Sequence, residues 1–177
     1  MRHRLPLLVV LALAACATAC SSVGTGTVVA PAAAAEASPT ALPPAHLATL
    51  AGEPTDVGRV ADGRVALVSL WATWCDSCQK EMDALNRLNA ATAEGHDAVV
   101  IGVDVGEEAQ TVAAFAARRG LRYAQLLDER FELADAVGQR RLPCTLVVDR
   151  RGRIVFRGDA LDARALEALR RTIADPP

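Results

Sequence analysis

Two cysteines separated by two residues, Cys75 and Cys78, are the residues of this chain best suited to do chemistry. They directly follow an apolar run, and the residues after them have the spacing of an amphipathic helix. A helix N-terminus offers unpaired N–H groups and a partial positive charge, and both stabilise a thiolate. We therefore expect Cys75 to have the lower pKa and to attack a disulfide. Cys78, one turn further on, is placed to resolve the mixed disulfide.

A CxxC pair has two other uses, a zinc site and a permanent disulfide. Zinc needs two more ligands at similar spacing, and the remaining candidates, Cys144, His46 and His96, form no second pair. A permanent disulfide across so short a loop would constrain little of the unfolded chain. Thiol–disulfide exchange is favoured over both uses, and we expect neither a metal nor a cofactor.

The elements that must position the pair follow from the hydrophobic pattern. The run Val65–Trp71 predicts a strand buried on both faces, and Ser77–Thr92 predicts a helix with Cys78 on its apolar side. The other expected elements are strands at Ala98–Val103, Tyr123–Leu127, Cys144–Val148 and Arg153–Phe156, helices at Glu107–Arg119 and Phe131–Val137, and a last helix capped by Asp162 and reaching Ile173. Early strand–helix alternation predicts parallel crossovers, and the late hairpin makes the sheet mixed. The sequence therefore predicts an α/β fold with a mixed central sheet flanked by helices.

Two segments carry a resemblance to a known family. Trp71 to Met82 (WATWCDSCQKEM) resembles the active-site segment of the TlpA and ResA group of bacterial thiol-disulfide oxidoreductases. Leu142 to Asp149 (LPCTLVVD) resembles the cis-proline loop of the same group. The likeness runs from about Leu47 to Ile173 and implies a thioredoxin-like fold in which Pro143 is cis and lies against the CxxC.

The resemblance also implies partners. Backbone groups at Pro143, together with Leu142 and Trp74, would meet a bound substrate chain. The clients would be Cys-containing proteins, with cytochrome c maturation as one setting. A membrane thiol transporter of the DsbD or CcdA kind would supply the electrons.

Three positions near the cysteines bear on the chemistry: two carry an acidic residue, and the third has a serine where thioredoxins have an acid. Glu81 lies three residues after Cys78 and therefore near it on the helix. In ResA-like proteins a glutamate at this place tunes the cysteines, whereas the alternative is a solvated carboxylate. Asp76 disfavours the Cys75 thiolate by like-charge repulsion, which makes the dithiol a better reductant, so we predict a reductase. Ser69 stands where thioredoxins have a proton-transferring Asp, and Glu81 becomes the expected substitute.

Cys144 is the third thiol of the predicted domain and follows Pro143 directly, where relatives have Thr or Ser. We interpret it as a small buried core thiol. The alternative is a third redox thiol close to Cys78.

The N-terminal segment predicts export. Arg2 and Arg4 precede an apolar run, residues 5–15, that is too short to span a bilayer. The run ends in Leu-Ala-Ala-Cys16, which resembles a bacterial lipobox, and Cys20 offers a second, weaker match. An ordinary cleaved signal is the alternative. We expect a lipoprotein-type signal over residues 1–15, a flexible Ala/Pro/Ser linker over 16–46 and the folded domain over 47–177, tethered to the bacterial cell envelope and facing the periplasm or extracytoplasmic space.

Composition and residue spacing argue against several other functions. The formal charge is −2, and removal of the first 15 residues leaves about −4, which argues against nucleic acid as a partner. A copper-handling protein on this fold would want CxxxC and a later histidine, and no histidine follows His96. A peroxidase of the peroxiredoxin type would want Thr at Ala72. A non-catalytic binding module is the remaining alternative, against which the intact CxxC argues.

Overall fold

A computed structural model describes residues 39–95 and 97–175 of the chain. Within these residues one mixed sheet has eight strands in the order β1-β8-β7-β4-β5-β6-β2-β3. Strand β4 pairs in parallel with β5, and β5 pairs in parallel with β6, whereas β7 runs antiparallel to β4. The strands are β1 (Thr40–Ala41), β2 (Leu47–Thr49), β3 (Pro54–Thr55), β4 (Val65–Trp71), β5 (Ala98–Val105), β6 (Ala124–Asp128), β7 (Cys144–Val148) and β8 (Arg153–Gly158).

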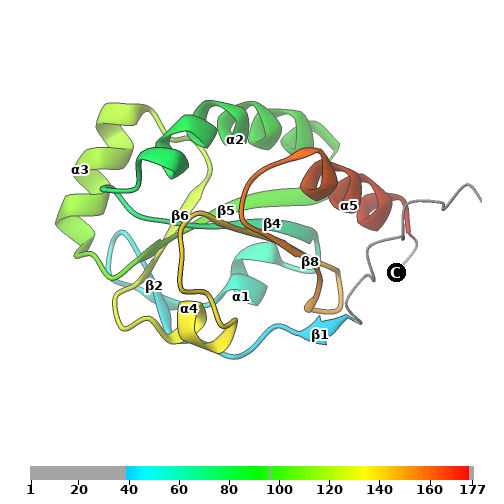
Figure 1. Ribbon diagram of the computed structural model, residues 1–177, viewed down its shortest axis with the longest axis horizontal. Coiled ribbons are helices and arrows are strands. Elements are labelled where there is room, and N and C mark those ends of the chain that lie inside the picture. Colours follow the sequence, from blue (N-terminus) through cyan, green and yellow to red (C-terminus); the bar gives the residue numbers. More distant parts are fainter. Residues whose placement is uncertain (1–38, 96, 176–177) are drawn as a thin grey trace, which may run out of the picture. The chain divides into compact units, whose positions relative to one another are not determined.

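Helices cover both faces of this sheet (Figure 1). One face carries α2 (Asp76–Gly95), α3 (Ala109–Arg119) and α5 (Ala163–Ala174), and the other carries α1 (Val57–Ala61) and α4 (Glu132–Ala136). Because helices pack on both sides, every residue of β4 is buried, as expected for a central strand of an α/β sheet. The predicted mixed sheet flanked by helices is confirmed, in the arrangement of a thioredoxin-like fold.

Alternation along the strands divides the core into two sides. On the α1/α4 side, Val68, Leu70 and Val103 form one cluster. On the opposite side, Val65, Leu67 and Val100 pack with α2 and α5. At the α2/α3 end of that same side, Trp71 and Leu127 pack with both cysteines of the CxxC.

Strand β5 is longer than the pattern predicts. The apolar run ends at Val103, but pairing with β4 and β6 continues, so that Asp104 and Val105 belong to the strand. A carboxyl group inside a buried strand breaks the hydrophobic pattern, and the pattern alone therefore ends the strand two residues too early.

The ordered domain begins before the predicted boundary at Leu47. Thr40 and Ala41 pair with Ile154 and Arg153 of β8, and the Leu42 N–H donates to Gly152 O at 2.8 Å. Without β1, strand β8 would be an edge strand with unpaired backbone groups, and the segment at Thr40 and Ala41 pairs with these groups. The composition of the segment does not reveal this pairing. Within residues 40–46, which the composition assigns to the linker, Thr40 and Ala41 thus pair with β8, and Leu42 and Ala45 pack against the core. The predicted signal and the cysteines Cys16 and Cys20 lie outside the described residues.

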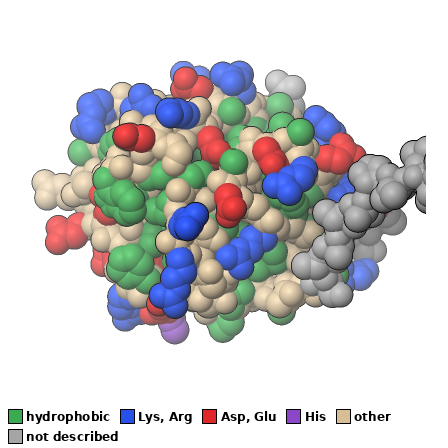
Figure 2. Space-filling view, viewed as in Figure 1, with side chains coloured by type: hydrophobic (Ala, Val, Ile, Leu, Met, Phe, Trp, Pro, Cys, Tyr) green, Lys and Arg blue, Asp and Glu red, His purple; other side chains and the backbone are tan. Residues whose placement is uncertain are grey.

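The surface of the described residues carries charges of both signs. On the face shown in Figure 2, basic and acidic side chains are interspersed with hydrophobic ones. Among the described residues, no helix has both the length and the apolarity needed to cross a membrane.

The contacts of β1 predict a measurable contribution to stability. A chain beginning at His46 loses the β1–β8 pairing and the packing of Leu42 and Ala45 against the core, whereas a chain beginning at Pro39 keeps them. We expect the shorter chain to be less stable by about 1–2 kcal/mol, the scale of one partly buried apolar side chain. Urea unfolding of both chains measures this, and equal midpoints would show that β1 contributes nothing.

Candidate active site

The CxxC lies where β4 ends and α2 begins. Cys75 and Cys78 form a disulfide with an S–S distance of 2.02 Å. Helix α2 starts at Asp76, so Cys75 stands at its N-terminus, and the Cys78 N–H points at Cys75 Sγ at 3.2 Å. The same N–H is available to a Cys75 thiolate after reduction, which lowers the free energy of the ionised sulfur. This geometry favours Cys75 as the attacking thiol.

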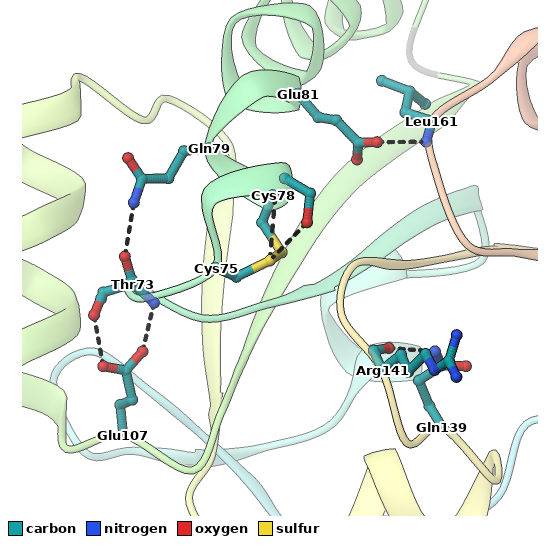
Figure 3. The surroundings of a disulfide bond; sticks show 10 residues. Thr73, Cys75, Cys78, Gln79, Glu81, Glu107, Gln139, Arg141 and Leu161 are labelled. Carbon is teal, nitrogen blue, oxygen red and sulfur yellow. Dashed lines mark hydrogen bonds between the residues drawn. A yellow bond between two sulfur atoms is a disulfide. The ribbon is translucent and has the colours of Figure 1, made fainter.

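The segment leading to Cys75 is anchored through Thr73. Its N–H and hydroxyl both donate to the Glu107 carboxylate, at 2.5 and 2.6 Å. Its carbonyl oxygen accepts from Gln79 Nε2 at 2.8 Å. Figure 3 shows Thr73 between these two side chains, one from α2 and one from the loop after β5. Every polar group of Thr73 is therefore engaged, and this fixes the approach to Cys75.

A turn after β5 aims Glu107 at Thr73. Gly106 has φ +84°, in the left-handed region, and a Cβ at this position would collide with Phe131 Cζ. Phe131 itself has φ 61° and is half exposed, with its ring lying over the glycine. Both the positive φ and the close Phe131 ring therefore require a glycine at position 106.

Asp104, three residues before Glu107, is a fully buried carboxyl group. It is 0% exposed, and neither oxygen has a hydrogen-bond partner at normal geometry within the described part of the chain. Burial, together with the neighbouring Glu107 carboxyl, raises the pKa of Asp104 from its ordinary 3.8 to about 8. Asp104 is therefore protonated at neutral pH. Neither acid stands out in the sequence as a site residue, although an Asp that directly follows an apolar strand run is a signal for the first of them.

The loop before β7 supplies the other side of the site. The Leu142–Pro143 peptide bond is cis, as the resemblance implied. Pro143 is buried, and Leu142 is partly buried and packs against the cluster that contains the cysteines. Trp74 is 69% exposed, whereas Cys75 beside it is 5% exposed. An apolar ring thus stands in solvent next to a nearly buried sulfur.

Glu81 lies on α2 with its carboxyl directed at the loop before α5 (Figure 3). Oε1 accepts the Leu161 N–H at 3.1 Å, and Oε2 is buried without a hydrogen-bond partner among the described residues. Burial raises the pKa of Glu81, and the backbone bond from Leu161 partly opposes the increase. Glu81 is therefore a part-buried carboxyl rather than a fully solvated one.

Cys144 is a free, fully buried thiol on the opposite side of the sheet from the CxxC. It pairs in register with Leu70 and packs in that residue's cluster on the α1/α4 side. Burial raises the pKa of Cys144 to about 11, so the thiol is protonated at neutral pH. These facts favour the core-packing interpretation over a third redox thiol.

Within residues 39–95 and 97–175, no group of three or more His, Cys, Asp or Glu is arranged to hold a metal ion. The donors available at the site are the two sulfurs and isolated carboxylates, which suit thiol–disulfide chemistry rather than a metal centre.

The fold and the CxxC define a thioredoxin-like protein. Residues 39–157 match the model of the AhpC/TSA family, and because this is more than half of the chain, the protein belongs to that family.

Curated relatives agree with this assignment. The chain is 30% identical over 92 residues to the thiol-disulfide oxidoreductase ResA of Geobacillus thermodenitrificans, covering 52% of each protein. It is 31% identical over 109 residues to ResA of Halalkalibacterium halodurans, covering 62% of this chain and 61% of that one. The aligned part thus spans little more than half of these relatives. The ResA resemblance is confirmed.

Solved structures agree in fold. A thiol-disulfide oxidoreductase from Bacteroides fragilis has a TM-score of 0.65 at 22% identity, covering 75% of this chain and 98% of that one. A secreted Mycobacterium tuberculosis disulfide oxidoreductase has a TM-score of 0.60 at 18% identity, covering 71% and 94%. At such identities the likeness extends to the fold.

The buried Asp104 predicts a pH-dependent stability. Between about pH 4 and pH 8 the unfolded chain has ionised this group and the folded chain has not. The unfolded state then binds fewer protons, so the contribution of Asp104 to stability is lost as pH rises through this range and levels off above it. We expect Asp104→Asn to become progressively more stable relative to wild type over that range, as measured by urea unfolding at several pH values. A difference in unfolding free energy that stays constant with pH would show that Asp104 is not protonated in the folded chain.

The turn at Gly106 predicts that two Gly→Ala substitutions will reduce stability by different amounts. Gly106→Ala introduces both a disfavoured φ and a collision with the Phe131 ring, whereas Gly120→Ala introduces only the φ, since its Cβ would meet nothing within 4 Å. We expect the Gly120 variant to lose about 1–2 kcal/mol. The Gly106 variant should lose more, and equal losses in urea unfolding would show that the Phe131 contact is unimportant.

Proposed function

We propose that this protein is an extracytoplasmic thiol-disulfide oxidoreductase that reduces disulfides of client proteins. The observation that carries the proposal is the Cys75–Cys78 disulfide at the N-terminus of α2, with the Cys78 N–H directed at Cys75 Sγ. The names of the ResA relatives support the same chemistry.

The reaction is a two-electron exchange between sulfurs. The Cys75 thiolate attacks one sulfur of a client disulfide, forms a mixed disulfide and expels the other client sulfur as a thiolate. Cys78 then attacks Cys75 Sγ, releases the second client thiol and closes the Cys75–Cys78 disulfide. The client gains two electrons, and a dithiol donor must return two to the enzyme. The disulfide-bonded structure is the product state of this cycle.

Several residues are proposed to serve this cycle. Trp74 offers an exposed apolar face to the client beside the reactive sulfur. Leu142 and the backbone at cis-Pro143 are proposed to hold the client chain. Burial raises the pKa of Glu81, and we propose that this carboxyl group holds a proton for the cysteine pair. Asp76 is proposed to favour the reducing direction of the reaction.

The cellular setting is proposed from the N-terminal sequence. A lipid on Cys16, or alternatively Cys20, would hold the domain at the cell envelope, facing the periplasm or extracytoplasmic space. A DsbD- or CcdA-like membrane protein is the proposed electron donor, and cytochrome c maturation is one proposed use.

The peroxidase alternative lacks a required group. Ala72, where that chemistry wants a Thr, is fully buried and has no hydroxyl. The thiol–disulfide proposal needs no such hydroxyl.

Insulin reduction tests the proposal. Cys75→Ser should reduce insulin no faster than background, because the attacking sulfur is gone. Cys78→Ser should accumulate mixed disulfides at Cys75, because resolution is lost. Cys144→Ser is the matched control and should keep its activity, since that thiol lies on the other side of the sheet. Wild-type-like turnover in the Cys75 variant would overturn the proposal, and peroxide consumption without insulin reduction would favour the peroxidase.

A further inference from the structure

A buried acid lies next to the proposed redox site, on a strand other than the expected one. Ser69 leaves the position of the thioredoxin-type acid without a carboxyl group, and Asp104 introduces one on the neighbouring strand β5. Asp104 pairs in register with Trp71 of β4 and with Leu127 of β6. Both of those side chains belong to the cluster that contains Cys75 and Cys78, so Asp104 shares their side of the sheet.

Asp104 is connected to the active-site segment through Glu107. The Glu107 carboxyl acts on Asp104 from one side, and accepts the N–H and hydroxyl of Thr73 on the other. Thr73 is two residues before Cys75. A change of charge at Asp104 can therefore reach the approach to the reactive sulfur through two intervening residues.

The surroundings of Asp104 leave Glu107 as the charged group that acts on it. Strands β4 and β6 present Trp71 and Leu127, and the loop after β5 presents Glu107. Helices α2 and α3 contribute apolar side chains and the cysteine pair to the same side, namely Cys78, Met82, Val112 and Phe115, with Cys75 just before α2. In the oxidised protein the two cysteines do not titrate, because they are joined in a disulfide.

We propose that Asp104 is a positioning residue: its protonated, neutral form leaves Glu107 in place as the anchor of Thr73, and its ionisation loosens that anchor and slows attack by Cys75. This role rests on the proposed thiol–disulfide function. A neutral Asp104 does not repel the Glu107 carboxylate, which keeps its charge and its place for the two Thr73 donors. An ionised Asp104 would instead place two negative charges side by side in a buried region, and the more exposed Glu107 side chain would be driven away from Thr73.

The Thr73 amide reports this directly. Its N–H bonds to Glu107 at 2.5 Å, so its NMR shift is sensitive to that contact. In the oxidised whole chain, isotope-labelled, we expect the Thr73 amide to titrate with a midpoint near pH 8. The titration should vanish in Asp104→Asn. It should move to lower pH in Glu107→Gln, where the neighbouring charge is removed but an oxygen acceptor is kept.

Asp128→Asn is the matched control. Asp128 is also a buried acid with a raised pKa, on the adjacent strand, but its carboxyl accepts the Ala134 N–H and has no hydrogen bond to Thr73 or Glu107 among those seen in the described residues. The Thr73 titration should persist in this variant. Persistence in Asp104→Asn, absence from wild type, or loss in the Asp128 control would each overturn the assignment.

The rate of Cys75 alkylation in the reduced protein tests the functional half. Above about pH 8, wild type should react about two- to tenfold more slowly than Asp104→Asn, since one nearby charge changes a thiol pKa by up to about one unit. Identical pH profiles would contradict the positioning role. The Thr73 measurement uses the oxidised protein without any client, so it separates this inference from a failure of disulfide reduction itself.

Discussion

Burial of β4 on both faces is the constraint on which the rest of the site depends. All seven residues of this strand are buried, with β5 on one side and β7 on the other. A strand held in this way ends at a fixed place, and the chain must leave the sheet directly after Trp71. The cysteines therefore fall at the start of α2, where unpaired N–H groups are available to a sulfur.

Strand pairing also brings the supporting residues to this edge. The parallel partner β5 ends beside β4, and its terminal loop carries Glu107 to Thr73. The antiparallel partner β7 begins there, so cis-Pro143 immediately precedes the strand at the same end. Three segments distant in sequence thus meet around one disulfide because their strands are neighbours in the sheet.

The polar groups at this end of the sheet are unevenly satisfied. Thr73 has partners for its N–H, hydroxyl and carbonyl groups, which makes the approach to Cys75 rigid. Asp104 is buried with both oxygens unpartnered among the described residues, and Glu81 has one such oxygen. A buried carboxyl without partners is costly when ionised, so both groups hold protons more tightly than exposed acids do.

Much of the site could be predicted from sequence because its parts are local. The CxxC, its place after a buried strand and before a helix, and the proline before β7 are all contained in short segments with clear patterns. By contrast, the strand β1 and the anchor formed by Glu107 depend on residues far apart in sequence. Nothing in the composition around Thr40 indicates pairing with β8, because the partner supplies the unpaired backbone groups.

The sequence by itself determined the CxxC pair and its place at the start of a helix, since two thiols at this spacing and the helix that follows them are encoded locally. It did not determine which acids lie near the thiols. Ser69 and Glu81 drew attention because they are close to the cysteines in the chain, whereas Asp104 reaches their side of the core through the register of β5 with β4. Register also decided that Cys144, next to Pro143 in sequence, faces away from the CxxC, because successive side chains of a strand point to opposite sides.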